Sequence, residues 1–251
     1  MAIQKTEAIV LSTQPFRSSS LIVTFFSRSF GKMKGIAKGV RLDRELRGAL
    51  YELFTRLEIV YYEKNRSDLH LLSEASIIES YEPMRTRLEP ICYASYFAEL
   101  VDDLTEIYDP HENIFDLLDF VFRYLPSLPG PRLARLFEIK LLNAVGWLPF
   151  LESCVQCGEK RLDRGFFSPG QGALLCPQCA SRFSDAQALA PEPLAIMRYY
   201  IAHGLEDSIR QGMTRQTEGD LEALLKRFFD MRLHRPLESL RFLEQLKPAF
   251  H

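Results

Sequence analysis

The chain has 251 residues and a formal net charge of −2, with 47% hydrophobic and 25% charged residues. This globular balance excludes intrinsic disorder, a collagen-like chain and a coiled-coil rod. The length predicts two modest domains, because a typical domain has roughly 100–150 residues. No apolar run approaches the roughly 20 residues that span a bilayer, and the first residues lack a secretory signal pattern, so we expect no membrane segment and no export.

The charge is unevenly distributed along the chain. Residues 1–80 contain twelve Lys and Arg against nine Asp and Glu, a net charge of +3, and the remainder carries −5. The basic excess therefore belongs to the N-terminal part.

Five strand-like runs rich in Ile, Val, Leu, Phe and Tyr occupy this N-terminal part. They are residues 4–12, 20–28, 32–39, 50–63 and 68–79. Five short strands in so few residues predict a small closed barrel, which leaves no strand edge exposed.

Period-two alternation in the third run separates two faces. One face holds Lys32, Lys34, Ile36 and Lys38, and the other holds Met33, Gly35, Ala37 and Gly39. The first face is cationic, and the second is small enough for the interior of a tight barrel. In the fourth run, Leu53, Leu57, Ile59 and Tyr61 alternate with Glu52, Arg56 and Glu58.

Helical spacing begins after Pro83. The helical runs are 85–107, 111–125, 131–146, 188–203, 218–232 and 237–247. Asp109-Pro110-His111-Glu112 is typical of an N-cap followed by Pro at the first helical position and a capping box. We therefore predict an α+β protein with a barrel domain at 1–80 and an all-helical domain at 81–251, into which residues 150–182 are inserted.

The inserted segment carries two CxxC pairs, which we predict to form a structural zinc ribbon. The four ligands are Cys154, Cys157, Cys176 and Cys179. The pairs stand eighteen residues apart, within the usual range for four thiolates around one zinc ion. Zinc would replace the core that so short a segment cannot build. Thiolates that bind metal instead of forming disulfides indicate a reducing compartment, and so a cytoplasmic protein.

The sequence contains none of the common catalytic motifs. It contains no G-x-x-x-x-G-K-[ST] loop, G-x-G-x-x-G turn, H-E-x-x-H motif or G-x-S-x-G elbow, and its five histidines are scattered. Four thiolates close the metal's coordination shell, whereas a catalytic zinc keeps a position open. We therefore expect a protein that is not an enzyme. Cys92, among apolar residues of the first helix, is expected to be a small buried side chain.

A cluster of positive charges between residues 28 and 47 is the sharpest charge feature of the chain. It consists of Arg28, Lys32, Lys34, Lys38, Arg41, Arg44 and Arg47. Such a basic strip can follow a phosphate backbone and bind nucleic acid in a salt-dependent way. The alternative is an ordinary solvated surface, since basic loops are common. Most aromatic residues of this part must fill the barrel.

Long segments of the chain resemble the RecO family of bacterial recombination mediators. The resemblance rests on TEAIVLSTQPFRSSSLIVTFFSRSFGKMKGIAKGV, on LYELFTRLEIVYYEKNRSDLHLLSEASII and on the CxxC pairs that interrupt a helical domain. It implies an N-terminal OB-fold barrel and a helical C-terminal domain with an inserted zinc ribbon. It also implies a protein of the bacterial cytoplasm, associated with the nucleoid, that acts in DNA repair.

The resemblance implies binding and annealing of single-stranded DNA, with duplex DNA bound as well. It further implies joint action with RecR and the single-strand-binding protein SSB in the RecFOR pathway, which helps RecA load onto SSB-coated DNA. Gly31, Lys32, Lys38 and Gly39 fall in the family's basic strand and loop, the expected DNA surface. Where many relatives have Glu or Asp after the aromatic that ends the first strand, this chain reads Phe16-Arg17-Ser18-Ser19-Ser20, a more basic loop. Some relatives lack the cysteines, which implies a stabilising zinc.

Two other functions are compatible with the same residues. A zinc-ribbon module that binds RNA or the ribosome is one, since OB barrels also bind RNA. A zinc-dependent hydrolase is the other. Competition between single-stranded DNA and RNA separates the first two functions, and the effect of chelation on turnover separates the third.

Overall fold

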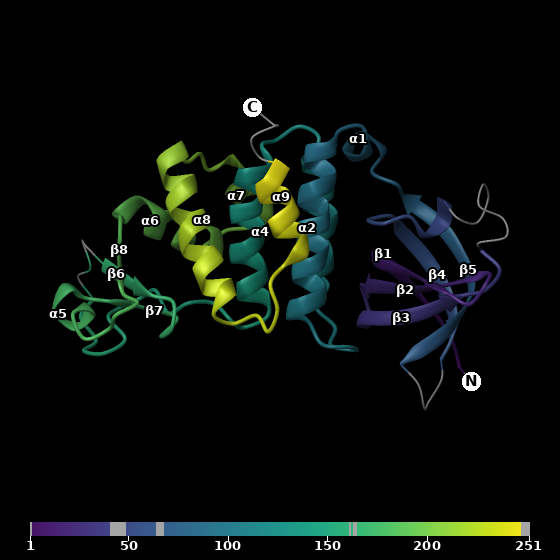
Figure 1. The fold of residues 1–251 in the computed structure, drawn as a ribbon, viewed down its shortest axis with the longest axis horizontal. Coiled ribbons are helices and arrows are strands. Elements are labelled where there is room, and N and C mark those ends of the chain that lie inside the picture. Colours follow the sequence, from purple (N-terminus) through teal and green to yellow (C-terminus); the bar gives the residue numbers. More distant parts are fainter. Residues whose placement is uncertain (1, 41–48, 64–67, 161, 163–164, 247–251) are drawn as a thin grey trace. The chain divides into compact units, whose positions relative to one another are not determined.

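The computed structural model describes all residues except 1, 41–48, 64–67, 161, 163–164 and 247–251. The chain forms two compact units, residues 1–128 with 237–251 and residues 129–236 (Figure 1). The first unit thus combines the N-terminal strands with helices that follow residue 81. The predicted division into domains 1–80 and 81–251 stays a prediction.

The N-terminal strands of the first unit close into a five-stranded barrel. They are β1 (Ile3–Phe16), β2 (Ser20–Ser27), β3 (Gly31–Ala37), β4 (Arg56–Tyr62) and β5 (Leu69–Glu79). The order around the barrel is β1-β2-β3-β5-β4, and all pairs are antiparallel except β3 with β5. The predicted closed barrel is confirmed, with the five strands of an OB-fold.

Alternating side chains of these strands fill the barrel. Its core contains Ala8, Val10, Val23, Phe25, Met33, Ala37, Leu57, Ile59, Tyr61 and Leu72. A Cβ at Gly35 would lie 2.7 Å from Leu72 side-chain atoms, so the interior at this position has no room for a larger residue. The predicted inward face of the third run is therefore confirmed for Met33, Gly35 and Ala37. Gly39 lies beyond the end of β3, where a Cβ would meet nothing within 4 Å, so its placement on that face was wrong.

The fourth strand begins later than the sequence pattern predicts. Residues 50–55 are not part of it, since a short 3₁₀ helix, η2 (Ala49–Tyr51), and a turn precede Arg56. Phe54 takes a φ of 70°, a left-handed conformation that interrupts an extended strand. Its ring packs edge-on against Phe122 at a centroid distance of 5.6 Å.

Among its described residues, the first unit also contains four α-helices. They are α1 (Glu82–Arg85), α2 (Leu88–Leu104), α3 (Glu112–Tyr124) and α9 (Glu238–Leu246). The Glu99 carboxylate of α2 accepts hydrogen bonds from the backbone amides of Glu238 (3.0 Å) and Ser239 (2.8 Å). An acid at a helix N-terminus satisfies otherwise unpaired amides, so this contact attaches α9 to α2. Cys92 is buried in α2, as predicted.

The cap of α3 differs from the predicted capping box. The helix starts at Glu112 and its N-cap is His111, not Asp109. The Asp109 carboxylate instead lies 2.9 Å from the His111 ring, so it does not serve the helix amides.

The second unit consists of helices and a small sheet. The helices are α4 (Gly130–Ala144), α5 (Pro177–Ala180), α6 (Pro191–Ala202), α7 (Leu205–Arg210) and α8 (Arg215–Asp230). The strands β6 (Gly165–Ser168), β7 (Ala173–Leu175) and β8 (Gln187–Leu189) form a sheet in the order β7-β6-β8. Leu221, Leu224, Leu225, Phe228 and Phe229 form the buried stripe of α8. Across the described parts of both units, every helix is too short or too polar to cross a membrane.

Gly31 offers a test of how the α2–α3 connection packs on the barrel. A Cβ at Gly31 would lie 1.9 Å from the Asp109 carbonyl oxygen, whereas a Cβ at Gly39 meets nothing within 4 Å. Both glycines have positive φ, 65° and 74°, so Gly39→Ala is a matched control for backbone strain. We expect Gly31→Ala to lower the free energy of unfolding by about 3 kcal/mol and Gly39→Ala by about 1 kcal/mol.

Urea unfolding of the two variants measures this difference. Equal losses would contradict the close approach of the connection to β3.

Candidate functional site

The four predicted metal ligands converge in the second unit. Cys154 and Cys157 lie between α4 and β6, and Cys176 and Cys179 lie at the start of α5. Their ligand atoms all lie within 4.8 Å of one another, and the sulfurs of Cys157 and Cys176 are 3.8 Å apart. A tetrahedral site with metal–sulfur bonds of about 2.3 Å has sulfur–sulfur edges of about 3.8 Å, so these sulfurs fit around one ion.

Backbone hydrogen bonds fold each CxxC pair into a tight turn. The Gly158 amide donates to the Cys154 carbonyl at 2.8 Å, and the Cys179 amide donates to the Cys176 carbonyl at 3.1 Å. Gly158 closes the first turn with a φ of 75°, which glycine adopts without strain. Leu175 is buried beside the cysteines, and the surrounding apolar cluster is small. A bound ion would therefore supply cohesion that side-chain packing cannot.

The protonation of the four thiols also favours a bound cation. Burial opposes ionisation of Cys154, but backbone amides of Cys176, Cys157 and Gln156 donate to its sulfur and lower the pKa of Cys154 to about 6. The side-chain hydrogen bond with Cys176, together with burial, raises the pKa of Cys179 to about 12. Adjacent thiolates repel one another, so all four ionise together only when a cation compensates their charge.

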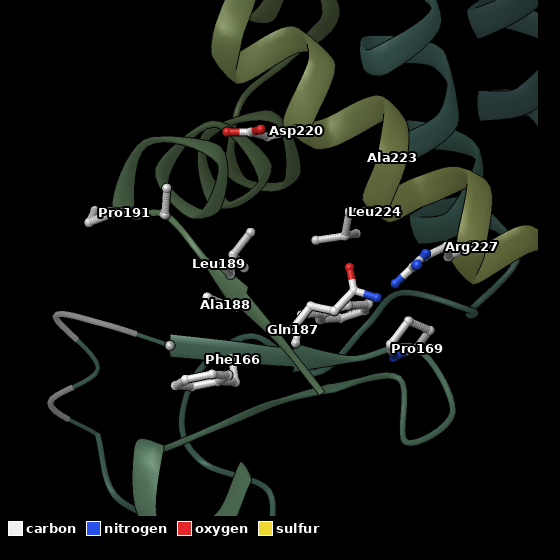
Figure 2. Close-up of a pocket in the computed structure, with 13 residues that line it drawn as sticks. Phe166, Pro169, Gln187, Ala188, Leu189, Pro191, Asp220, Ala223, Leu224 and Arg227 are labelled. Carbon is white, nitrogen blue, oxygen red and sulfur yellow. The ribbon is translucent and has the colours of Figure 1, made fainter. Parts of the chain in front are cut away.

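A cavity of about 550 Å³ lies beside the metal-ligand segment, between the β6–β8 strands and α8 (Figure 2). Its lining is mainly apolar, with Phe166, Leu189 and Leu224 among its side chains. Asp220 and Arg227 supply its charges from two different turns of α8. The described lining residues include no Cys, His, Ser or Lys, so this cavity assembles no nucleophile and base of the usual kind.

The structure divides the predicted basic strip into parts with different surroundings. Arg28 lies against α3, where its guanidinium pairs with Glu112 and Asp116, both at 2.7 Å, and stacks over the Phe115 ring at 4.4 Å. Lys32 lies against the end of α2, 3.4 Å from the Asp102 carboxylate, and it also donates to the Asp102 carbonyl. These two cations therefore pack the barrel onto its own helices.

Lys34 and Lys38 lie on a part of the outer barrel face where no described acid of α2 or α3 forms an ion pair with them. Lys34 is half-buried and Lys38 is exposed, and neither forms an ion pair with any residue in the described ranges. The strip's last three members, Arg41, Arg44 and Arg47, lie outside the described residues. The assignment of the whole strip to nucleic-acid binding stays a prediction.

A half-buried carboxylate on α3, Asp119, adds further contacts between this helix and the barrel. Asp119 accepts hydrogen bonds from Arg56 at 3.1 Å and Arg123 at 3.0 Å, and also from the Tyr81 hydroxyl. Arg56 in addition pairs with Glu7 at 2.6 Å. Burial alone would raise the pKa of Asp119, but the hydrogen bonds from Arg123 and Tyr81 and the two positive charges lower it. Sequence reasoning missed this network, although the opposite charges of the two parts of the chain hinted at it.

Comparison with known proteins identifies the family. Residues 1–81 match the family model "Recombination protein O N terminal", and residues 85–241 match "Recombination protein O C terminal". The chain belongs to the RecO family.

Individual relatives named "DNA repair protein RecO" agree over nearly the full length. The protein of Anaeromyxobacter dehalogenans strain 2CP-C is 30% identical over 249 residues, 97% of each chain. That of Halalkalibacterium halodurans is 29% identical over 98% of this chain and 97% of its own. That of Koribacter versatilis is 32% identical over 97% of this chain and 99% of its own. The chain is thus a RecO protein of DNA repair and recombination whose barrel lies within the N-terminal match.

The metal centre of this RecO protein can be tested by removing one ligand. We expect the purified wild-type chain to carry one metal ion and Cys176→Ser to carry almost none, because three thiolates bind a tetrahedral ion much more weakly. The second unit should then unfold at a lower temperature. Cys92→Ala is the matched control, since Cys92 is buried away from the cluster and should leave the metal content unchanged.

Metal analysis and thermal unfolding measure both effects. A metal-free wild-type chain with full thermal stability would contradict the assignment.

The Asp119 network of the first unit predicts a dependence on pH. The folded-state pKa of Asp119 is lowered, so its stabilisation is complete above the unfolded value of about 3.9 and is lost as pH falls below it. We expect Asp119→Asn to lower the free energy of unfolding by about 2 kcal/mol near neutral pH, with the difference shrinking towards about pH 3.

Denaturant unfolding at both pH values compares Asp119→Asn with the wild type. Protonation of the four cysteines in acid would affect both proteins alike, so their difference isolates Asp119. Asp230→Asn, an exposed acid of α8, is the control. A difference that is equally large in acid would exclude the ionised carboxylate as its source.

Proposed function

We propose that this protein is a non-enzymatic mediator of DNA repair and homologous recombination. It binds and anneals single-stranded DNA, and together with RecR it helps load RecA onto SSB-coated DNA in the bacterial cytoplasm. The observation that carries this proposal is a closed barrel of the OB type in a RecO-family chain, with Lys34 and Lys38 on an outer face that no described acid pairs with.

The proposed DNA surface is narrower than the basic strip. Lys34 and Lys38 are its first members, because their ammonium groups can replace the counterions of a phosphate backbone. Arg41, Arg44 and Arg47 follow Lys38 directly in the sequence, and we propose that they extend this surface. Arg28 and Lys32 are engaged by acids of α3 and α2, so we assign them to packing.

The proposed metal is one structural zinc ion. Four thiolates in a tetrahedron suit zinc or iron, and a mononuclear zinc ion suits two separate CxxC turns. When bound, the ion supplies cohesion to the segment 150–182. The metal analysis of the wild-type chain also distinguishes the two elements, and stoichiometric iron would contradict zinc.

The absence of catalysis is also part of the proposal. Four thiolates around one ion leave no position for a substrate or a reactive water. The lining of the cavity beside α8 is mainly apolar, and its two charged groups, the Asp220 carboxylate and the Arg227 guanidinium, lie on different helical turns. Binding, rather than bond making, is the activity that these groups support.

The partners follow from the family. We propose RecR and SSB as protein partners, and single-stranded and duplex DNA as ligands. We propose that DNA binds to the barrel domain, residues 1–80, and that protein partners bind to the surfaces of the helical domain, residues 81–251.

A salt titration tests the DNA surface. We expect Lys34→Glu combined with Lys38→Glu to weaken binding of single-stranded DNA and to flatten the dependence of log K on log salt by roughly 0.7 per lost phosphate contact. The matched control is Lys160→Glu with Arg182→Glu, an equal change of net charge at exposed positions of the second unit.

Competition with RNA of the same sequence completes this experiment. Preference for RNA would favour the RNA-binding alternative. An unchanged salt slope with the fold preserved, or an equal effect of the control pair, would remove Lys34 and Lys38 from the DNA surface.

A further inference from the structure

The strand register defines a row of side chains on the open part of the barrel. Phe16, the last residue of β1, pairs with Ser20 of β2. The neighbouring residue Leu21 pairs with Ala37 of β3, so the next step of the register brings Lys38 opposite Ser20. Lys38 is the first residue after β3, so Phe16, Ser20 and Lys38 follow one another across β1, β2 and the end of β3, with Phe16 and Lys38 about 10 Å apart at two strand spacings.

This row faces away from the barrel core. Leu21 and Ala37 pack with the core, and successive residues of a strand point to opposite faces. Phe16 is half-buried and is not part of the core cluster. Ser20, which lies between them, is buried, so Phe16 and the exposed Lys38 are the members of the row that a ligand can reach.

Arg17 completes the end of the β1–β2 hairpin. It is exposed, and its guanidinium lies 5.3 Å from the centroid of the Phe16 ring. Its φ is 54°, a left-handed conformation that costs a non-glycine residue free energy. The hairpin thus holds an aromatic ring and a planar cation together at a strained turn, where glycine would be more stable.

We propose that Phe16 and Arg17 form a base-stacking subsite and that Lys38 holds a phosphate of the same stretch of single strand. This inference rests on the proposed function and adds recognition of bases to the contacts with phosphates. Every base presents a flat π face, so an aromatic ring with a guanidinium plane accepts any sequence. A lysine two strand spacings away reaches towards the backbone that carries the stacked base. The strain at Arg17 is retained because the turn places the guanidinium over the ring.

A comparison of two strands separates stacking from charge. The probes are an oligothymidine and a base-free strand with the same number of phosphates. We expect Phe16→Ala to lower the affinity for oligothymidine roughly fivefold or more and to leave the affinity for the base-free strand unchanged. Lys38→Gln should weaken both strands equally and flatten the salt slope by roughly 0.7.

Arg17→Gly provides a second test, at an exposed residue whose side chain can be removed without opening a cavity. Glycine relieves the strained φ, so the midpoint of thermal unfolding should rise. The affinity for oligothymidine should fall more than that for the base-free strand, because the lost positive charge weakens both strands and the lost stacking weakens only the first. A turn with a purely structural role would show the first effect without the second. Phe242→Ala is the matched control, because Phe242 is an exposed phenylalanine of α9 and should change neither affinity.

The outcomes distinguish the subsite from the proposed function. A wild-type chain that binds neither strand at low salt would overturn both. A wild-type chain that binds, with Phe16→Ala and Arg17→Gly equal to it or weakened equally for both strands, would overturn the subsite and leave DNA binding on the barrel intact.

Discussion

The outer wall of the barrel is held against α3 by arginines, and this contact decides which part of the barrel can serve a ligand. Arg28 reaches Glu112 and Asp116, and Arg56 reaches Asp119, at 2.7 to 3.1 Å. Isolated surface ion pairs stabilise proteins little, but both guanidiniums also stack on Phe115, at 4.4 and 5.6 Å, and that of Arg56 is largely shielded from water. Planar guanidiniums suit such forked, stacked contacts. A polyanion could therefore bind only to the part of the barrel surface that α3 and these arginines do not cover.

The second unit depends on a different interaction, because its inserted segment has too few apolar side chains to form a core of its own. Two tight turns bring four sulfurs to within 4.8 Å of one another, and their mutual repulsion would oppose this arrangement without a cation. Folding of the segment and binding of the ion are therefore coupled. An ion held in this way would have a structural role, because four thiolates fill its coordination shell and leave no position for a substrate or water.

Local patterns in the sequence predicted the barrel and the metal centre well, because both depend on short-range spacing. Alternation in the third run placed Met33 and Ala37 in the core, and the CxxC spacing predicted the convergence of the cysteines. The start of β4 and the cap of α3 were wrong, since Phe54 and Asp109 are committed to contacts that the local pattern does not encode. The same limit applies to Arg28. A cluster of charges along the chain does not show which of them an acidic helix distant in sequence will neutralise.

Internal pairing also explains how a chain with a net charge of −2 is compatible with the proposed DNA surface. The acids of α2 and α3 that lie near the barrel are already paired with Arg28, Lys32 and Arg56, so they contribute little field at the open face. More distant acids are screened over about 8 Å at physiological salt. A phosphate backbone on the open face therefore responds mainly to the nearest unpaired cations. Few cations give modest affinity, and each phosphate contact that they make is sensitive to salt.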